Sequence, residues 1–474
     1  MPFYLLFEKE NRLMSSERTV LTEKRRIVFT NQMLKALIIP LVFEQLLTIT
    51  VGLADSLMVS RVGQASISAV NLVDQLSNLM IQVFAGMAAG GAAVAGQYLG
   101  KKRAEDARRS THHMFLLLLG VSLTITALLY LFSEGVLQLI NRNPDPEVIQ
   151  ATRTYYQIVM ASIPSIALYN GGAAVFRAMS KSRVTLWVSM LMNFINVIGN
   201  AVLIFGFGMD VAGVAIPTLV SRTVAAAVIL ILLAKPDLTL SLKSIFSFRY
   251  NAVMMKNILY IGVPGSAENG MFHLGRLVLA SLISSFGTVS QAANGIATTF
   301  GGFHHFTGTA INLALVTVIS QCVGAGAFDD ARYYMRKFMK ITYISMNISN
   351  AVELALLPLI LKVYASSPNV SGETVHLAAI LAILHGVASM IIWEPAFCFP
   401  AFLRAAGDAR YTMWFSMISM WLVRVLFAYV FGVFFGWGVI GVWLAHSVLD
   451  WIVRSAFFYS RYRSNQWETK AIKA

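Results

Sequence analysis

The chain has 474 residues, of which 57% are hydrophobic and only 13% are charged, and its formal net charge is +14. This length would allow roughly three soluble domains, but so few charged residues cannot cover that many soluble surfaces. The composition therefore excludes a cytosolic enzyme, a disordered protein and a fibrous repeat. A helix that crosses a bilayer needs about 20 apolar residues, so the chain is predicted to be an all-α polytopic membrane protein.

Twelve long apolar segments are predicted to be transmembrane helices. In chain order they lie near residues 34–59, 67–98, 113–140, 154–179, 184–206, 211–234, 256–286, 290–323, 338–364, 374–403, 411–435 and 438–460. A polar segment at 235–255 separates the first six from the last six. We therefore expect an N-terminal lobe at 34–234 and a C-terminal lobe at 256–460, flanked by tails at 1–33 and 461–474.

The distribution of positive charge predicts the topology. Of the 37 Lys and Arg residues, 30 fall in tails and loops on one side of the twelve-helix arrangement and four on the other. Because Lys and Arg accumulate in cytoplasmic loops, both termini are expected to be cytoplasmic, in a cytoplasmic (inner) membrane. The same bias accounts for the net charge of +14 without a nucleic-acid partner.

The two halves of the chain resemble each other at matched positions, which indicates an internal duplication. The offset between matched residues is 224 at first, then 227 and finally 228. Two repeats of six helices have the same orientation, related by a pseudo-two-fold axis along the membrane normal, which suits alternating access. The matched pairs are Pro40 and Pro264, Glu44 and Glu268, Gln97 and Gln321, Gly100 and Gly324, Arg177 and Arg404, Ala178 and Ala405, and Gly213 and Gly441.

No nucleotide-binding site is predicted. The segment from Gly96 to Lys102 has three residues between its glycines where a phosphate-binding loop has four, and it lacks the Ser or Thr that binds magnesium. We therefore expect no ATP and no cofactor, with energy supplied by an ion gradient or by a partner. The adjacent histidines at 112–113 and 304–305 do not have the spacing of a zinc motif.

Acidic residues inside the apolar segments are the main functional candidates, because a charge in hydrocarbon is costly. Asp55, near the end of the first segment, is the first candidate. Glu44 and Glu268, each four residues after a proline, are secondary candidates that could instead stabilise the helix near that proline. Asp74 is a further secondary candidate, which like Glu353 could be a polar packing group.

Uncharged polar residues in the fifth and sixth segments extend the candidate site. Asn193, Asn196 and Asn200 are spaced three and four residues apart, so they share one helix face. Thr218 directly follows Pro217, where the helix backbone is expected to be interrupted. Oxygen groups that converge with one carboxylate suit a sodium ion and equally tolerate a proton carrier. Hydrogen bonding between helices is the alternative explanation.

These residues belong to a pattern that resembles the multidrug and toxic compound extrusion (MATE) family, in its bacterial branch. The resemblance covers nearly everything from about residue 30 to 467. It is carried by Pro40 with Glu44, Val51 to Ser56, Gly63 to Val70, Gly90 to Gly100, Pro264 to Phe272, Phe286 to Thr288, Leu403 to Arg410, and Gly441 to Trp443.

The resemblance implies a secondary antiporter with two six-helix lobes around a central cavity, and we expect the chain to act as a monomer. It would export organic cations or drug-like amphiphiles by alternating access, in exchange for H⁺ or Na⁺. The implied site for the coupling proton or sodium ion is Asp55, Asn196, Asn200 and Thr218, although an aspartate is common in the family where Asn200 stands. Pro40, Gly52 and Pro264 are expected to be the hinges of the helices that change shape during exchange.

Charged residues elsewhere in the segments leave alternatives open. Arg222, Arg276 and Arg424 lie inside predicted helices and could pair with anionic head groups, which would favour a flippase for lipid-linked saccharides. Asp450 is expected to form an ion pair with Arg454 four residues later on the same helix. A second alternative, an intramembrane enzyme or sensor, lacks both a catalytic constellation and a soluble output domain.

Overall fold

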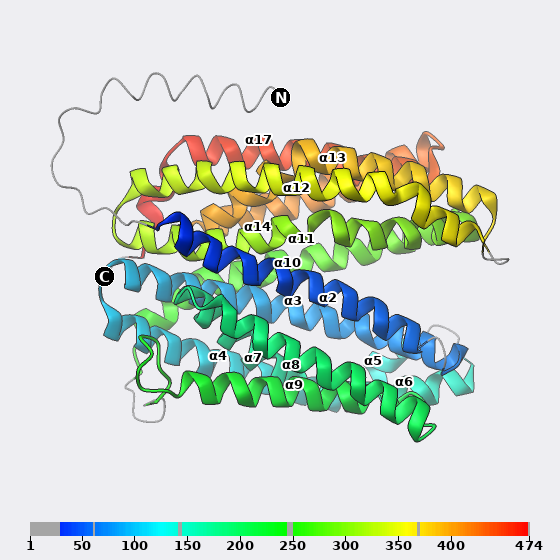
Figure 1. Cartoon of the computed structure of the whole chain (residues 1–474), viewed down its shortest axis with the longest axis horizontal. Helices are drawn as coiled ribbons and strands as arrows, with labels where there is room; N and C mark the ends of the chain where they lie inside the picture. Colours follow the sequence, from blue (N-terminus) through cyan, green and yellow to red (C-terminus); the bar gives the residue numbers. More distant parts are fainter. Residues whose placement is uncertain (1–28, 60–61, 141–144, 244–249, 367–369, 473–474) are drawn as a thin grey trace.

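The computed structural model describes residues 29–59, 62–140, 145–243, 250–366 and 370–472. Within these ranges all regular structure is helical, and the long helices run side by side along the molecule (Figure 1). The fold class predicted from the sequence is confirmed. Most of the predicted tail at 1–33 and part of the predicted linker at 235–255 lie outside the described residues.

The N-terminal half contains α2 (Asn31–Val59), α3 (Gln64–Gly100), α4 (Ala104–Leu131), α5 (Ser133–Ile140), α6 (Pro146–Met160), α7 (Ile163–Ala178), α8 (Ser182–Ala201), η1 (Val202–Gly206) and α9 (Ala212–Leu233). The C-terminal half contains α10 (Ala252–Ser284), α11 (Thr288–Gly324), α12 (Phe328–Ala365), α13 (Gly372–Ala405), α14 (Ala409–Ile418), η2 (Ser419–Val425), α15 (Leu426–Tyr429), η3 (Val430–Phe434), α16 (Gly438–Leu444), η4 (Ala445–Leu449), α17 (Asp450–Arg463) and η5 (Gln466–Lys470). The elements η1 to η4 are π-helical turns inside longer helices, and η5 is a 3₁₀ turn.

The described helices account for twelve membrane crossings. Ten helices, counted through their π turns, are long and apolar enough to cross a bilayer, and the bent pair α6 and α7 makes an eleventh. The twelfth is α10, whose 33 residues are long enough to cross although Glu268 lies inside it. This number agrees with the sequence prediction.

Three crossings differ clearly from their predicted ranges, one of them being that predicted at 338–364, which begins earlier as α12 with Asp329 and Asp330 in its first turn. The crossing predicted at 113–140 begins earlier, with α4, and its last residues form the separate helix α5. It begins early because Glu105 and Asp106 interact favourably with the helix dipole in a first turn outside the apolar run. The crossing predicted at 154–179 is two helices that meet at 43°. Pro164 in the first turn of α7 favours this break, because proline cannot donate a backbone hydrogen bond.

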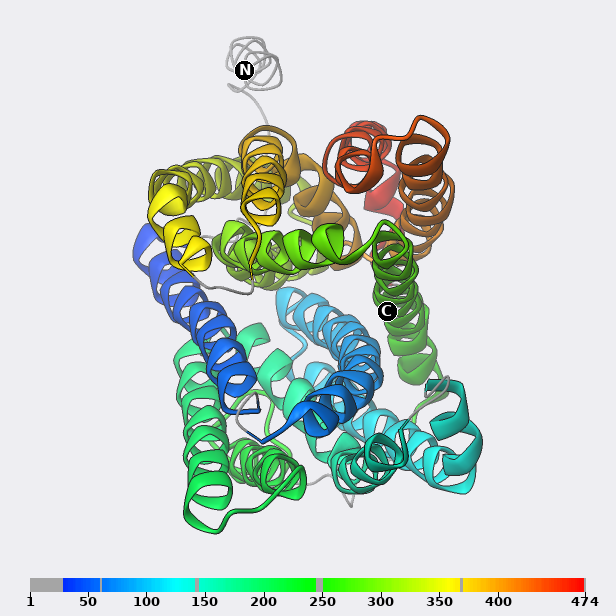
Figure 2. The same ribbon diagram turned by 90° about the vertical axis from the view of Figure 1, so that its right-hand side faces the viewer.

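Each half begins with a helix that packs against the other half. Figure 2 shows α2 (blue) and α10 (green) on opposite sides of the molecule, each lying between the two halves. The start of α2, with Leu34 and Leu37, is buried in a hydrophobic core of the C-terminal half. The start of α10, with Met254 and Ile258, is buried in the core of the N-terminal half. A pseudo-two-fold relation between the repeats produces this reciprocal exchange.

Small residues let α3 and α10 cross at close range. A Cβ atom at Gly86 would lie only 2.6 Å from the backbone of Gly265, so no larger residue fits there without a shift. Next to this contact, the hydroxyl of Ser266 donates a hydrogen bond to the carbonyl oxygen of Val83, at 2.7 Å. Close approach at small residues, with polar groups bonded across, is typical of packing between transmembrane helices.

The outer surface of the bundle is apolar. Trp187 and Phe194 on α8 are 67% and 64% exposed, and Phe434 on η3 is 82% exposed. A soluble protein rarely carries such large exposed apolar side chains over a wide surface. In a twelve-helix bundle they are the surface that faces the lipid chains.

Candidate functional site

The N-terminal half contains a cavity of about 520 Å³, which is large enough for a drug-sized molecule. It lies among α2, α3, α6, α8 and α9, and its wall is partly apolar, with side chains such as Val59 and Met192. The polar side chains of the wall are those of Asp55, Asn71, Asp74, Tyr155, Asn193, Asn196, Thr218, Ser221 and Arg222.

Three of the four residues that the sequence singled out, Asp55, Asn196 and Thr218, line the cavity, and the fourth, Asn200, is buried behind its wall against Asp55. Nδ2 of Asn200 donates a hydrogen bond to Oδ1 of Asp55, at 3.0 Å. The amide of Asn196 lies between Asp55 and Thr218, with one terminal atom 3.0 and 3.1 Å from the carboxylate oxygens and the other 3.2 Å from Oγ1 of Thr218. Because an ionised carboxylate only accepts, we assign the nitrogen to the side that faces Asp55. We call these four residues the Asp55 cluster.

Local features of α8 and α9 hold the Asp55 cluster together. A Cβ atom at Gly199 would lie 2.7 Å from Cβ of Pro217, so the absence of a side chain lets the two helices approach closely. This contact places the asparagine face of α8 beside Thr218, whose hydroxyl also lies 3.0 Å from the carbonyl oxygen of Val214. The π turn η1 begins two residues after Asn200, and π turns are frequent at functional sites.

A second polar group lies in the same cavity, around Asp74. The hydroxyl of Tyr155 donates a hydrogen bond to Oδ1 of Asp74, at 3.0 Å. Arg222 donates from Nη1 to the hydroxyls of Ser77, at 3.2 Å, and Ser162, at 2.8 Å. Arg222 and Asp74 both line the cavity, and their opposite charges interact. The sequence pointed to Asp74 but did not connect it with Tyr155 or Arg222.

The two secondary glutamates do not line this cavity. Glu44 is buried, accepts a hydrogen bond from Thr185 at 2.7 Å, and lies 3.9 Å from Nη1 of Arg177. Glu268 is also buried and accepts from Nη1 of Arg404 at 2.9 Å. Since both pairs match in the internal repeat, the same ion pair occurs once in each half.

The prediction of an ion pair between Asp450 and Arg454 is wrong, because the two side chains make no direct contact. Asp450 instead accepts two hydrogen bonds from Arg424, at 3.1 Å from Nε and 2.6 Å from Nη2. Arg424 is only 2% exposed, and a buried guanidinium needs a counter-charge more than an exposed one does. Arg454 lies 3.9 Å from Glu268, and its charge also interacts with that of Asp450 without a direct ion pair.

The hinge candidates lie within continuous helices. Pro40 and Gly52 are inside α2, which runs without a break from Asn31 to Val59. Pro264 is inside α10, next to the close crossing with α3. Gly52 also lines the cavity beside Asp55.

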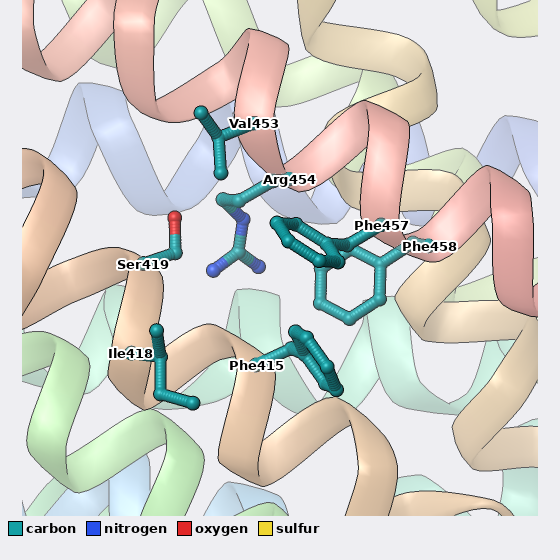
Figure 3. A pocket seen from close by; sticks show the side chains of 7 residues that line it. All are labelled: Phe415, Ile418, Ser419, Val453, Arg454, Phe457 and Phe458. Atoms are coloured by element: carbon teal, nitrogen blue, oxygen red, sulfur yellow. The ribbon is translucent and has the colours of Figure 1, made fainter.

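A second cavity in the C-terminal half is too small for a substrate. Figure 3 shows the guanidinium of Arg454 among the rings of Phe415, Phe457 and Phe458. The cavity has a volume of about 10 Å³, which is room for about one water molecule. The drug-sized cavity of the N-terminal half is therefore the stronger candidate for a binding site.

Comparison with known proteins agrees with this arrangement. The MatE family model matches residues 40–202 and 264–430, which is most of both halves. The chain belongs to the MATE family. Members of this family are membrane transporters of small molecules rather than enzymes, so the chain is a multi-pass membrane transporter of the multidrug and toxic compound extrusion type.

Several curated relatives span almost the whole chain. The chain is 28% identical over 442 residues to the uncharacterized transporter YisQ of Bacillus subtilis, covering 91% of this chain and 94% of that protein. It is 22% identical to a probable multidrug resistance protein NorM of Thermotoga maritima, covering 92% and 93%. A FAD transporter of Shewanella oneidensis is 23% identical, over 62% of this chain and 65% of that protein.

Solved structures share the fold at low sequence identity. A crystal structure of MATE in complex with MaL6 superposes with a TM-score of 0.85 at 19% identity, covering 92% of this chain and 97% of that one. A transporter of the MOP superfamily from Pyrococcus furiosus superposes with a TM-score of 0.84 at 19% identity, covering 92% and 96%. These similarities support the twelve-helix fold and carry no information on substrate.

Proposed function

We propose that the chain exports cationic, drug-sized amphiphiles by antiport with protons, and that Asp55 binds the coupling proton. The observation that carries the proposal is the position of Asp55, with Asn196 and Thr218, in the wall of a drug-sized cavity, with Asn200 bonded to Asp55 behind that wall. Asp55 and Asp74 give this wall two carboxylates against the single guanidinium of Arg222. A wall with this balance of charge attracts a cation rather than an anion.

The hydrogen-bond donors around Asp55 favour a proton over a sodium ion. Hard cations bind oxygen ligands, whereas the carboxylate of Asp55 faces the amide nitrogens of Asn196 and Asn200. When Asp55 takes up a proton, its hydroxyl can donate to Oδ1 of Asn196 if that amide turns over. The site therefore offers hydrogen-bond partners to both protonation states of Asp55.

Competition for one carboxylate accounts for antiport. A proton on Asp55 removes the negative charge that a cationic substrate in the cavity would use. By thermodynamic linkage, each ligand then weakens the binding of the other by the same factor. Exchange follows when the two halves alternate between openings to the two sides of the membrane, each ligand leaving on the side where the other binds.

We infer the orientation in the membrane from the uneven distribution of Lys and Arg between the loops on its two sides. The loops that begin at Lys101, Met179 and Ala325 follow the ends of α3, α7 and α11, and most Lys and Arg residues outside the helices lie on this side of the topology. We assign this side to the cytoplasm under the positive-inside rule. A cationic substrate would then enter the cavity from the cytoplasm and leave on the far side.

Transport by the purified chain in proteoliposomes tests this function. A cationic dye should be carried against its own gradient when a proton gradient is imposed, and a protonophore should abolish that transport. A sodium gradient of equal size, without a pH difference, should drive none. Dye transport that follows sodium alone would overturn the choice of ion. Transfer of a lipid-linked saccharide between leaflets, with no dye transport under either gradient, would point to a flippase.

A further inference from the structure

The C-terminal half contains a cluster of histidines that the Asp55 cluster does not involve. Four of the eight histidines of the chain meet there: His304 and His305 on α11, His385 on α13 and His446 on η4. The ring of His385 lies centrally, with its centroid 5.6 Å from His304, 4.9 Å from His305 and 5.2 Å from His446. Glu353 on α12 is the carboxylate in direct contact with the cluster.

One close contact dominates the cluster. Nδ1 of His304 lies 2.6 Å from Oε2 of Glu353, with the two side chains only 1% and 10% exposed. Neither of these two atoms has a partner in hydrogen-bond geometry among the described residues, so two electron-rich atoms are in contact here, and a proton shared between them would remove their repulsion. Nε2 of His304 and Oε1 of Glu353 have no hydrogen-bond partner among the described residues. Burying polar groups without hydrogen bonds costs free energy, which makes this intramembrane pair a functional candidate.

A hydroxyl connects two of the other histidines. Oγ of Ser447 lies 2.6 Å from Nδ1 of His385 and 3.3 Å from Nδ1 of His446. A hydroxyl can donate to one ring and accept from another, so it can pass a proton between them. His446 is half-buried, whereas His385 is buried, so the sequence from His304 through His385 to His446 runs toward a more accessible side chain.

The remaining histidine has a packing role. The ring of His305 stacks on Trp393 at a centroid distance of 5.4 Å, and its Nε2 lies 3.2 Å from the hydroxyl of Ser389. These contacts satisfy His305 within the core. It is therefore not part of the path from Glu353 to His446.

The charged groups of the neighbouring helices leave Glu353 as the acid of this cluster. Arg424 on η2, whose charge reaches the histidines, is paired with Asp450 on α17. Arg276 on α10 adds a second positive charge on that side. Glu394 on α13 interacts instead with Tyr343 on α12. Among the described residues, no group of three His, Cys, Asp or Glu side chains could hold a metal ion.

The internal repeat gives this cluster a counterpart in the N-terminal half. The offset of 228 residues that matches Gly213 with Gly441 also matches Thr218 with His446. Thr218 belongs to the Asp55 cluster. The two halves thus place polar groups at the same point of their sixth crossing, through different residue types.

We propose that Glu353 and His304 form a second proton-binding site, in the C-terminal half, and that His385, Ser447 and His446 form a path by which its proton exchanges. The site binds a proton at the 2.6 Å contact between the carboxylate and the imidazole. This site is separate from Asp55, so the proposal for it does not depend on the proposal that Asp55 binds the coupling proton. A transporter with both sites binds protons in each half.

Infrared difference spectra of the purified full-length chain in lipid, recorded between acid and alkaline pH, test the site. The protonated carboxyl group of a buried acid gives its own stretching band. The wild type should show a titrating band that Glu353→Gln lacks and that Glu353→Asp retains at a changed frequency. His304→Gln should move the titration midpoint of this band by about one pH unit or more, because the two groups titrate as a coupled pair.

Two further variants separate this site from other acids. Glu373→Gln makes the same change at an exposed acid in the first turn of α13 and should leave the band intact. Asp55→Asn should also leave the Glu353 band intact, whether or not Asp55 takes part in transport. A band that persists unchanged in Glu353→Gln would overturn the proposal. If that variant does not fold, an unmoved midpoint in His304→Gln, with Glu353→Asp indistinguishable from wild type, would overturn it equally.

Discussion

Gln97 and Gln321 make the same contact in opposite directions across the two halves. Nε2 of Gln97 donates a hydrogen bond to the carbonyl oxygen of Ala405, at 2.8 Å, and Nε2 of Gln321 donates to that of Ala178, at 3.0 Å. All four residues match in the internal repeat. These bonds join the ends of α3 and α13, and of α11 and α7, so they hold the two halves together at this end of the molecule.

Two glycines allow these helix ends to approach. A Cβ atom at Gly100 would lie 2.0 Å from the carbonyl oxygen of Gln321, and one at Gly324 would lie 2.0 Å from that of Gln97. Gly100→Ala should therefore push this end open, because overpacking costs about 1–3 kcal/mol. Cys322, fully buried beside the contact, can report the opening.

In a Cys398→Ser background, where Cys322 is the only thiol of the chain, Gly100→Ala should raise the rate of maleimide labelling about tenfold or more. Gly120→Ala is the matched control, since a Cβ atom there would meet no other atom within 4 Å. Equal labelling rates in the two variants would show that the glycine contact does not hold this end closed.

The proposed topology can be tested by cysteine labelling in intact cells. A cysteine at Gly208 or Gly436 should react with an impermeant thiol reagent added outside, whereas one at Lys243 should react only after the cells are opened. Background labelling should be low because Cys322 and Cys398 are both buried. The reverse pattern would contradict the assignment of the positively charged side to the cytoplasm.

The effects of substituting Arg222 and Asp74 on thermal stability should not be additive. Arg222→Gln leaves Asp74 in the cavity wall without the positive charge that interacts with it, so it should lower both thermal stability and dye transport. Adding Asp74→Asn removes the uncompensated carboxylate and should restore most of the stability. A double-mutant cycle measured by thermal unfolding gives the interaction energy, which we expect to be about 0.5–3 kcal/mol. Strictly additive effects would contradict this coupling.

Removing one partner of the buried ion pair between Arg424 and Asp450 should strongly destabilise the chain. Asp450→Asn leaves a buried guanidinium uncompensated and should destabilise the chain by about 3–5 kcal/mol. Glu134→Gln breaks an exposed pair of similar length with Arg153, at 2.7 Å, and should cost less than about 1 kcal/mol. Similar losses of melting temperature in the two variants would contradict the importance of burial.

The sequence predicts the fold well because apolar length and charge bias depend on residues near one another in the chain. Spacing along one helix is also a local property, so it correctly predicted that Asn196 and Asn200 share a face of α8. Contacts between helices could not be predicted in this way: Asp450 pairs with Arg424 because their helices meet, not because of spacing along one helix. Arg222 lies four residues after Thr218, so the shared face of α9 could have placed it in the site.

Two other groups were missed for different reasons. The histidine cluster combines residues from three helices, and adjacent histidines alone gave no sign that His385 and His446 would join them. Glu394 is fully buried, neither of its carboxylate oxygens has a hydrogen-bond partner among the described residues, and it lies inside an apolar segment. The rule that drew attention to Asp55 applies equally to Glu394 and would have found it.

The central claim is that the carboxylate of Asp55 couples proton movement to export. Its most direct test is the simultaneous measurement of dye and proton fluxes in proteoliposomes that contain equal amounts of wild type, Asp55→Asn or the exposed control Asp237→Asn. Asparagine resembles the protonated acid but cannot release a proton, so Asp55→Asn should insert normally and lose both gradient-driven export and the linked proton flux. Asp237→Asn should match the wild type. Full coupled transport by Asp55→Asn would contradict the account.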